Sequence, residues 1–166
     1  MMSDSENQIT ISKPRISDKK KIANLHFLMI HNELQKITPP VCQFFDLTLV
    51  KEDVEETIQE MIDDPEHDVM VALVDGKFAG YVALWKEEYP DDLVPAPYST
   101  IEYLEVDPEF SHLGIGQKLM EEAERIAREK KHPYLELLVW ETNEKAIHLY
   151  EKNGFSPIVR RMVKKL

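Results

Sequence analysis

The chain has 166 residues, of which 43% are hydrophobic, and its 31 acidic and 20 basic side chains give a formal net charge of −11. This length suits one domain with a single core, which we expect over residues 8–166 after a disordered start at residues 1–7. The acidic balance argues against a nucleic-acid partner, because binding a phosphate backbone requires a positive surface. No apolar run is long enough to span a bilayer, and the first residues are polar, unlike a secretory signal.

Cysteine and histidine usage narrows the class further. Cys42 is the only cysteine, which excludes an intrachain disulfide and a multi-cysteine metal site. The six histidines show no metal-ligand spacing. The sequence therefore predicts a cytoplasmic protein that has no structural metal and no membrane partner.

The first half of the chain shows alternating and helical apolar patterns. Ile22, Leu25 and Met29 fall on one face of a helix. The dipeptide Asp75-Gly76 lies between two strand-like runs and is typical of a tight hairpin. In chain order we expect an edge strand at 8–13, a helix at about 18–34 capped by Ser17, a loop at 37–49, a helix at about 51–63, and hairpin strands at 69–74 and 78–85.

The second half reads as strands alternating with helices. In chain order we expect a loop at 89–97, a strand at 99–106, a helix at 114–130, a strand at 134–140, a helix that Thr142 or Asn143 caps and that ends at Asn153-Gly154, and one or two strands within 155–166. A strand–helix–strand unit of this length implies a parallel pair with a right-handed crossover. The predicted fold class is α+β, with a mixed, mostly antiparallel central sheet that contains one parallel pair.

The strand at 99–106 leads into a glycine turn, Gly114-Ile115-Gly116, that opens the next helix. Such a turn presents backbone N–H groups, and the positive end of the helix dipole, to an anion. Two glycines form neither the three-glycine dinucleotide motif nor a P-loop. Taken alone, the turn is equally consistent with tight packing at the helix entry.

Two segments together resemble the signatures of the GCN5-related N-acetyltransferase (GNAT) superfamily, whose members transfer acetyl from acetyl-CoA to an amine. The first segment runs from Ser111 to Gly116, with Ser111 in place of the usual Arg or Gln. The second is complete and consists of Asn143, Ala146, Tyr150, Gly154 and Phe155. The resemblance covers about residues 100–160 and implies the GNAT-like acyl-CoA N-acyltransferase fold, in which the parallel strands splay and helices cover both faces.

The resemblance also implies a binding site for acetyl-CoA as co-substrate. Amides of the glycine turn would hold its diphosphate, while the strand at 99–106 and Asn143 would hold the pantetheine arm. The expected binding residues are Leu104, Val106, His112, Leu113, Gly114, Ile115, Gly116, Gln117, Lys118 and Asn143. Tyr150 resembles the family's general acid, which protonates the departing thiolate. Two plainer roles stay open, an N-cap for Asn143 and a core aromatic for Tyr150.

The general base has several candidates. Glu102 matches the offset of a catalytic glutamate in the polyamine and aminoglycoside acetyltransferases of the superfamily. Glu105, Glu136 and a water chain to bulk solvent are alternatives. In the protein N-terminal acetyltransferases the base lies five residues before the motif asparagine, where this chain has Leu138. Nothing near Cys42 in the sequence would activate its thiol, so direct transfer is expected.

The distribution of acids predicts the acceptor. Nine acids and no Lys or Arg lie between Glu52 and Asp68. A second cluster consists of Glu87, Glu88, Asp91 and Asp92. Because such clusters steer cations, we expect a small cationic amine resembling a polyamine or an aminoglycoside. A protein N-terminus or lysine is an alternative acceptor, and a non-catalytic acyl-CoA sensor is a second alternative. Homodimers are usual for the superfamily.

Overall fold

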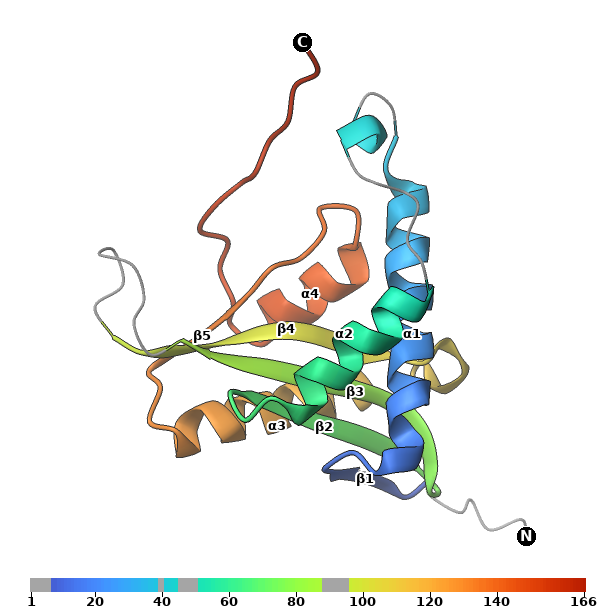
Figure 1. Cartoon of the computed structure of the whole chain (residues 1–166). Coiled ribbons are helices and arrows are strands. Elements are labelled where there is room, and N and C mark those ends of the chain that lie inside the picture. The colour runs from blue at the N-terminus through green and yellow to red at the C-terminus, as the bar shows by residue number, and fades with distance from the viewer. Residues whose placement is uncertain (1–6, 39–40, 45–50, 88–95) are drawn as a thin grey trace, which may run out of the picture.

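The computed structural model describes residues 7–38, 41–44, 51–87 and 96–166. A five-stranded sheet in the order β1-β2-β3-β4-β5 organises them (Figure 1). Its strands are β1 (Ile9–Ser12), β2 (His67–Val74), β3 (Lys77–Glu87), β4 (Tyr98–Val106) and β5 (Tyr134–Leu137). All neighbours pair antiparallel except β4 and β5, which are parallel. The predicted α+β class, with its mixed sheet, is confirmed.

Helices cover both faces of this sheet, as expected (Figure 1). The described helices are α1 (Ile16–Lys36), α2 (Lys51–Asp63), α3 (Ile115–Glu129) and α4 (Glu144–Lys152), with the 3-10 turns η1 (Val41–Phe44) and η2 (Pro108–Phe110). Helices α1 and α2 lie on one face and α3 on the other, while α4 lies beside the β4–β5 end (Figure 1). None of these helices combines the length and the apolar composition that crossing a bilayer requires.

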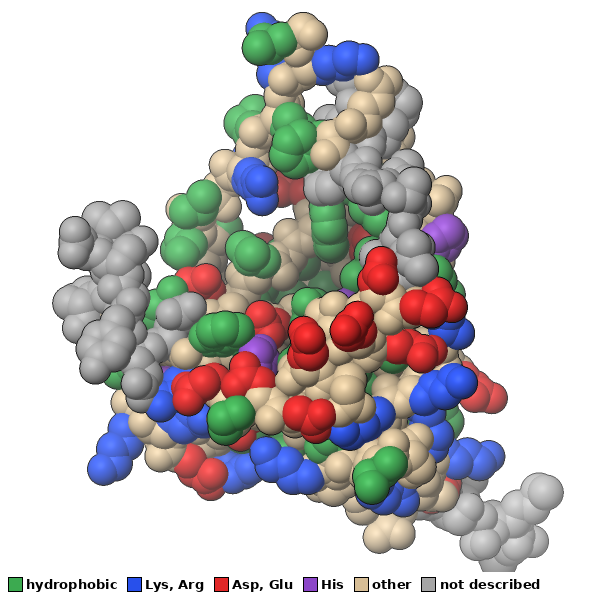
Figure 2. Space-filling model, in the orientation of Figure 1, with side chains coloured by type: hydrophobic (Ala, Val, Ile, Leu, Met, Phe, Trp, Pro, Cys, Tyr) green, Lys and Arg blue, Asp and Glu red, His purple; other side chains and the backbone are tan. Residues whose placement is uncertain are grey.

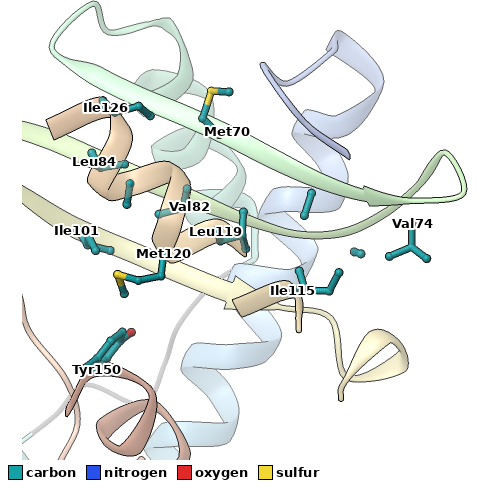
Figure 3. Packing of buried hydrophobic residues seen from close by; sticks show 13 residues of the cluster. Met70, Val74, Val82, Leu84, Ile101, Ile115, Leu119, Met120, Ile126 and Tyr150 are labelled. Carbon is teal, nitrogen blue, oxygen red and sulfur yellow. The ribbon is translucent and has the colours of Figure 1, made fainter. Parts of the chain in front are cut away.

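Each face of the sheet has its own core, because side chains alternate along a strand. The α1/α2 face buries Ile22, Ile58 and Val71. On the other face, α3 inserts residues such as Leu119 against the strands, and Tyr150 of α4 lies at the end of this core (Figure 3). The two cores hold the sheet rigid between the helix layers, so groups carried by β4 have fixed positions.

The parallel pair is splayed. Register joins only residues 98–101 of β4 to residues 134–137 of β5. Residues 102–106 of β4 have no β5 partner, although most of them still pair with β3. The second half of β4 therefore borders a gap on its β5 side. The strand β5 ends at Leu137, where the pairing with β4 stops, and does not reach residue 140 as the sequence predicted.

A β-bulge marks the point where the strands diverge. Ala83 and Leu84 are consecutive on β3, yet they oppose Tyr103 and Ile101 of β4. Glu102 is therefore an extra residue on β4, and bulges of this kind re-aim side chains.

The start of α1 differs from the sequence prediction. The helix begins at Ile16, one residue before Ser17, and its N-cap is Arg15. The Asp18 carboxylate accepts a hydrogen bond from the Arg15 amide at 3.0 Å and pairs with the Arg15 guanidinium, also at 3.0 Å. This reciprocal capping by Asp18 fixes the boundary.

The prediction of one or two strands within residues 155–166 is wrong. Residues 155–166 contain no helix or strand, and they run away from the sheet as an extended tail (Figure 1). Ile158 and Met162 are 82% and 85% exposed. The strand-like pattern is present in the sequence, but no buried face holds it within the described residues.

Candidate active site

The turn between β4 and α3 exposes a run of backbone amides. Gly114 is the N-cap of α3, with a left-handed φ of 75° and no side-chain cap. The bond from the Lys118 amide to the Gly114 carbonyl, 3.1 Å long, is the first of the helical ladder. The amides of residues 112–117 donate no hydrogen bond to another described residue. These donors and the helix dipole suit an anion such as a diphosphate.

The side chains around this turn leave it accessible. His112, Leu113 and Lys118 are exposed, and a Cβ added to Gly114 would meet no atom within 4 Å. Ile115 is buried in the core and anchors the start of the helix. The Ser111 hydroxyl donates to the Pro108 carbonyl at 2.8 Å, which stabilises the turn. The turn therefore has room for a ligand that approaches its backbone.

Gln117 makes contacts that the sequence did not reveal. Its side-chain amide exchanges hydrogen bonds with the Asn153 amide at 2.9 and 3.0 Å, which joins the first turn of α3 to the end of α4. Asn153 also donates to the Leu149 carbonyl at 2.8 Å. The Gln117 side chain is thus structural, and only its backbone amide belongs to the run of exposed amide donors at the turn.

The start of α3, the end of β4 and α4 meet at Gly116. A Cβ at this glycine would lie 3.3 Å from Leu149 of α4 and 3.8 Å from Val106 of β4. Val106 and Leu104, both half-buried, lie on the splayed half of β4. The structure therefore brings the predicted pantetheine strand next to the predicted diphosphate turn.

Asn143 is the N-cap of α4, and its side chain accepts from the Ala146 amide at 3.2 Å. Next to it, the Thr142 hydroxyl donates to the carboxylate of Glu33 at 3.3 Å. Glu33 belongs to α1 and is 5% exposed, so this bond fastens the loop before α4 to the opposite helix layer. The capping role is observed, and the side-chain N–H donors of Asn143 make no hydrogen bond to another described residue.

Tyr150 is buried on α4, with its ring 5.9 Å from that of Phe155. Burial raises the pKa of Tyr150 to about 12, and the charge of Glu105 adds to this shift. The phenol is therefore protonated at neutral pH and can donate.

The candidate carboxylates have different surroundings. Glu102 accepts from His67 Nε2 at 2.9 Å, while His67 Nδ1 lies 3.0 Å from Asp64. Glu136 of β5 lies in register with Thr100, in the half of β4 that pairs with β5. Glu102 is thus tied to β2 through His67, and Glu136 is outside the splayed half.

Among the candidate carboxylates, Glu105 has the surroundings that best suit a proton acceptor. It is 9% exposed and belongs to the splayed half of β4. One carboxylate oxygen, Oε1, lies 2.8 Å from His26 Nδ1 of α1. The other, Oε2, is buried and has no hydrogen-bond partner among the described residues. One sign of this contact was present in the sequence, because His26 lies four residues after Ile22 on the apolar face of its helix.

Acidic side chains gather on the face that carries α2 (Figure 2). The exposed acids of this helix include Glu52, Asp53, Glu56 and Glu60. Other acids of the predicted run are partly neutralised, because Asp63 pairs with Lys19 at 3.0 Å and Asp68 with Lys130 at 2.6 Å. The excess negative charge on this face is therefore concentrated on α2.

Several predicted features lie outside the described part of the chain. They are Glu88, Asp91, Asp92 and the side chains of Glu87 and Cys42. Among the described residues, no group of three or more His, Cys, Asp or Glu side chains is arranged to hold a metal ion.

Comparison with known proteins decides the family. Residues 27–155 match the model of the acetyltransferase (GNAT) family. The chain belongs to this family. It is 36% identical over 103 residues to an uncharacterized N-acetyltransferase of Archaeoglobus fulgidus, a match that covers 60% of this chain and 67% of that protein. An uncharacterized N-acetyltransferase of Lactobacillus delbrueckii subsp. lactis is 36% identical over 83 residues, which cover 50% of this chain and only 48% of that relative.

Solved structures agree on the fold. The aminoglycoside N-acetyltransferase AAC(6')-Iy in complex with CoA superposes with a TM-score of 0.74 at 13% identity, covering 98% of this GNAT chain and 97% of that one. A ribosomal-protein-alanine N-acetyltransferase from Brucella melitensis gives a TM-score of 0.66 at 16% identity, covering 96% and 100%. Because one neighbour is named for a small-molecule acceptor and the other for a protein acceptor, the fold alone does not select between them.

Proposed function

We propose that this GNAT protein transfers an acetyl group from acetyl-CoA directly to the primary amine of a small cationic acceptor in the cytoplasm. The observation that carries the proposal is the junction at Gly116, where the open amide turn, the splayed half of β4 and the α4 that bears Tyr150 meet. In this proposal the amides of residues 112–117 hold the diphosphate, and the free edge of β4 at Leu104 and Val106 holds the pantetheine arm.

The chemistry follows from the groups around the gap. A neutral amine attacks the thioester carbonyl, and a backbone N–H of β4 stabilises the oxyanion that forms. The Tyr150 phenol donates to the departing thiolate. A carboxylate of β4, either Glu102 or Glu105, accepts the proton that the ammonium form must lose. Rigid support from both cores maintains the attack geometry.

The acidic face of α2 supports a cationic acceptor. Its exposed acids, from Glu52 to Glu60, project a negative field that raises the encounter rate of a polyamine. Salt screens such a field over about 8 Å at physiological ionic strength. We expect kcat/KM for spermidine to exceed that for a neutral peptide amine, and to fall several-fold between low salt and roughly 0.15 M salt.

A matched pair of variants tests this steering. Neutralising Glu52, Asp53 and Glu56 to their amides should lower kcat/KM for spermidine and weaken its salt dependence. The control neutralises Glu121, Glu124 and Glu129, which lie on α3 across the sheet, and should leave both unchanged. If the peptide amine is the better substrate and salt has no effect, the acidic face serves solvation only and the protein-acetylating alternative is favoured.

We also propose that the protein forms a homodimer through its C-terminal tail. Residues 156–166 carry exposed Ile158, Met162 and Leu166, and they contain four basic side chains in a chain of net charge −11. The outer edge of β5 has no strand partner among the described residues. A tail that adds as a strand to β5 of a second copy would cover this edge and bring basic residues onto an acidic protein.

Light scattering tests the dimer. The wild-type chain should have a mass near twice 19.4 kDa, and the double variant Ile158→Lys, Met162→Lys should shift it toward the monomer. Ile16→Lys is the control, because Ile16 is 88% exposed on α1 and lies away from the tail. A wild-type monomer at all concentrations would mean that the tail pairs with its own β5 or stays free.

A further inference from the structure

A buried cluster on the α1/α2 face of the sheet joins three elements, with His26 from α1, Tyr81 from β3 and Glu105 from β4. We propose that Glu105 is the residue that takes the proton from the acceptor amine, and that His26 and Tyr81 are positioning residues that hold it for this step. The inference rests on the proposed acetyl transfer and assigns its base to one residue of β4.

The cluster fixes one oxygen of Glu105 and leaves the other, which is also buried, without a hydrogen bond to a described residue. His26 Nδ1 lies 2.8 Å from Glu105 Oε1 and 3.0 Å from the Tyr81 phenol oxygen. His26 is 4% exposed and Tyr81 is fully buried. With Nδ1–H donating to Oε1, the carboxylate is held in one orientation. Burial, and next the charge of Glu105, raise the pKa of Tyr81 well above its usual value, which keeps this phenol protonated.

The buried oxygen Oε2 of Glu105, which has no hydrogen-bond partner within the part of the chain that the structure describes, is the feature that indicates a ligand. Such a group is costly to maintain unless something fills its lone pairs during function. It is carried by the half of β4 that borders the gap. An ammonium group in this gap would satisfy Oε2, since it offers both charge and donors.

The backbone beneath Glu105 is fixed as tightly as its side chain. A Cβ at Gly80 of β3 would lie 2.5 Å from the Glu105 carbonyl oxygen. Only glycine therefore allows the two strands to approach this closely. The β4 backbone at Glu105 consequently has little freedom to shift, and the carboxylate keeps its place relative to the gap.

Glu105 is also coupled to the proposed acid. Its charge contributes to the raised pKa of Tyr150. When Oε2 takes a proton, this charge is neutralised and the Tyr150 phenol becomes a stronger acid. The two proton transfers therefore assist one another, because Glu105 is neutralised before the CoA thiolate takes a proton from Tyr150.

The proposed step balances. The ammonium gives one proton to Glu105 Oε2, and the resulting neutral amine forms the C–N bond at the thioester carbonyl. When the C–S bond breaks, the thiolate takes the proton of Tyr150, and the proton lost by the new amide nitrogen restores the phenol. The proton on Glu105 leaves through water, so each turnover releases one proton together with CoA and the acetylated amine.

Glu102, the base expected from the resemblance, is the direct competitor. Its carboxylate is 29% exposed and already accepts from His67 at 2.9 Å. Besides Glu102, the titratable group packed against the cluster is Tyr103, whose ring meets that of His26 at 4.3 Å. A comparison of Glu105→Gln with Glu102→Gln therefore separates the two assignments.

The test uses steady-state kinetics with acetyl-CoA and spermidine across pH. Glu105→Gln should lower kcat by about 100- to 10,000-fold, the range of a lost general base, and leave the KM for acetyl-CoA near the wild-type value. The fall in activity on the acid side of the profile should disappear. Glu102→Gln should lose less than tenfold and retain that acid limb. Equal losses in the two variants, or a larger loss in Glu102→Gln, would overturn the assignment.

The positioning residues need a readout that packing alone would not change. His26→Asn and Tyr81→Phe should each reduce kcat about tenfold and displace the acid limb of the pH profile, whereas a structural role would lower only the melting temperature. Asp18→Asn is the control, because Asp18 is a fully buried carboxylate at the far end of α1. An unchanged acid limb in both positioning variants would contradict their role.

A measurement without turnover separates this inference from the proposed function. The carboxyl carbon resonance of Glu105, observed in 13C-labelled protein, should shift when CoA and spermidine are added together, and the Glu102 resonance should not. A wild-type protein that binds acetyl-CoA and acetylates spermidine but shows no shift at Glu105 refutes the inference alone. Failure to bind acetyl-CoA at all refutes the proposed function instead.

Discussion

Replacing Gly114 with aspartate should abolish the thermal stabilisation that acetyl-CoA gives the wild-type protein. A ligand at 100 times its Kd stabilises the folded state by about 2.7 kcal/mol, or roughly 5–10 °C in Tm for a chain of this size. The Gly114 position is open to solvent within the amide turn. An aspartate there adds a carboxylate where the diphosphate must lie, so like charges repel at the site of binding.

Gly76 provides a matched control for backbone strain. It has a φ of 78°, close to the 75° of Gly114, and both have open space where a Cβ would lie. Gly76 belongs to the hairpin turn between β2 and β3, away from the amide turn. Gly76→Asp should lose similar intrinsic stability yet keep its full response to acetyl-CoA. A normal response in Gly114→Asp would remove the diphosphate from this turn.

Tyr150→Phe should reduce kcat by about ten- to a thousandfold, with a smaller change in the KM for acetyl-CoA, because the phenol acts mainly in the transition state. With a pKa of about 12, the phenol stays protonated across the neutral range, so its ionisation should not limit wild-type activity there. The substitution removes one oxygen and preserves the ring packing on Phe155. Stability should therefore change little.

Tyr134→Phe supplies the comparison, since Tyr134 is 61% exposed on β5. That variant should keep wild-type kcat and KM. If Tyr150→Phe also turns over at the wild-type rate, Tyr150 is only a core aromatic and another group protonates the thiolate.

Local signals in the sequence predicted much of this fold. The Asp75-Gly76 dipeptide predicts a two-residue hairpin, and both residues adopt the positive φ values, 49° and 78°, that such a turn requires. The glycine turn before α3 and the N-cap at Asn143 are equally local. These features are readable because one or two residues determine the backbone conformation.

The contacts that shape the site were not readable, because they join distant parts of the chain. His26 and Glu105 are 79 residues apart, and Gln117 and Asn153 are 36 residues apart. The bulge at Glu102 was also invisible, since the apolar pattern of β4 does not mark an inserted residue. It depends on how β3 and β4 pair, which is a property of the whole sheet.

At the C-terminal tail, by contrast, the composition of residues 155–166 predicted a strand, but the structure describes no strand there. Whether they pair depends on an available partner edge, and propensity alone does not supply one. A strand prediction without an identified neighbour is therefore a prediction about association as much as about secondary structure.

The release of CoA thiol from acetyl-CoA in the presence of spermidine, with mass spectrometry of the amine product, tests the central claim most directly. We predict catalytic formation of N-acetylspermidine at a rate proportional to protein concentration, and its loss in both Gly114→Asp and Tyr150→Phe. Binding of acetyl-CoA without CoA release, for spermidine, an aminoglycoside and a peptide amine alike, would contradict the claim and favour an acyl-CoA sensor.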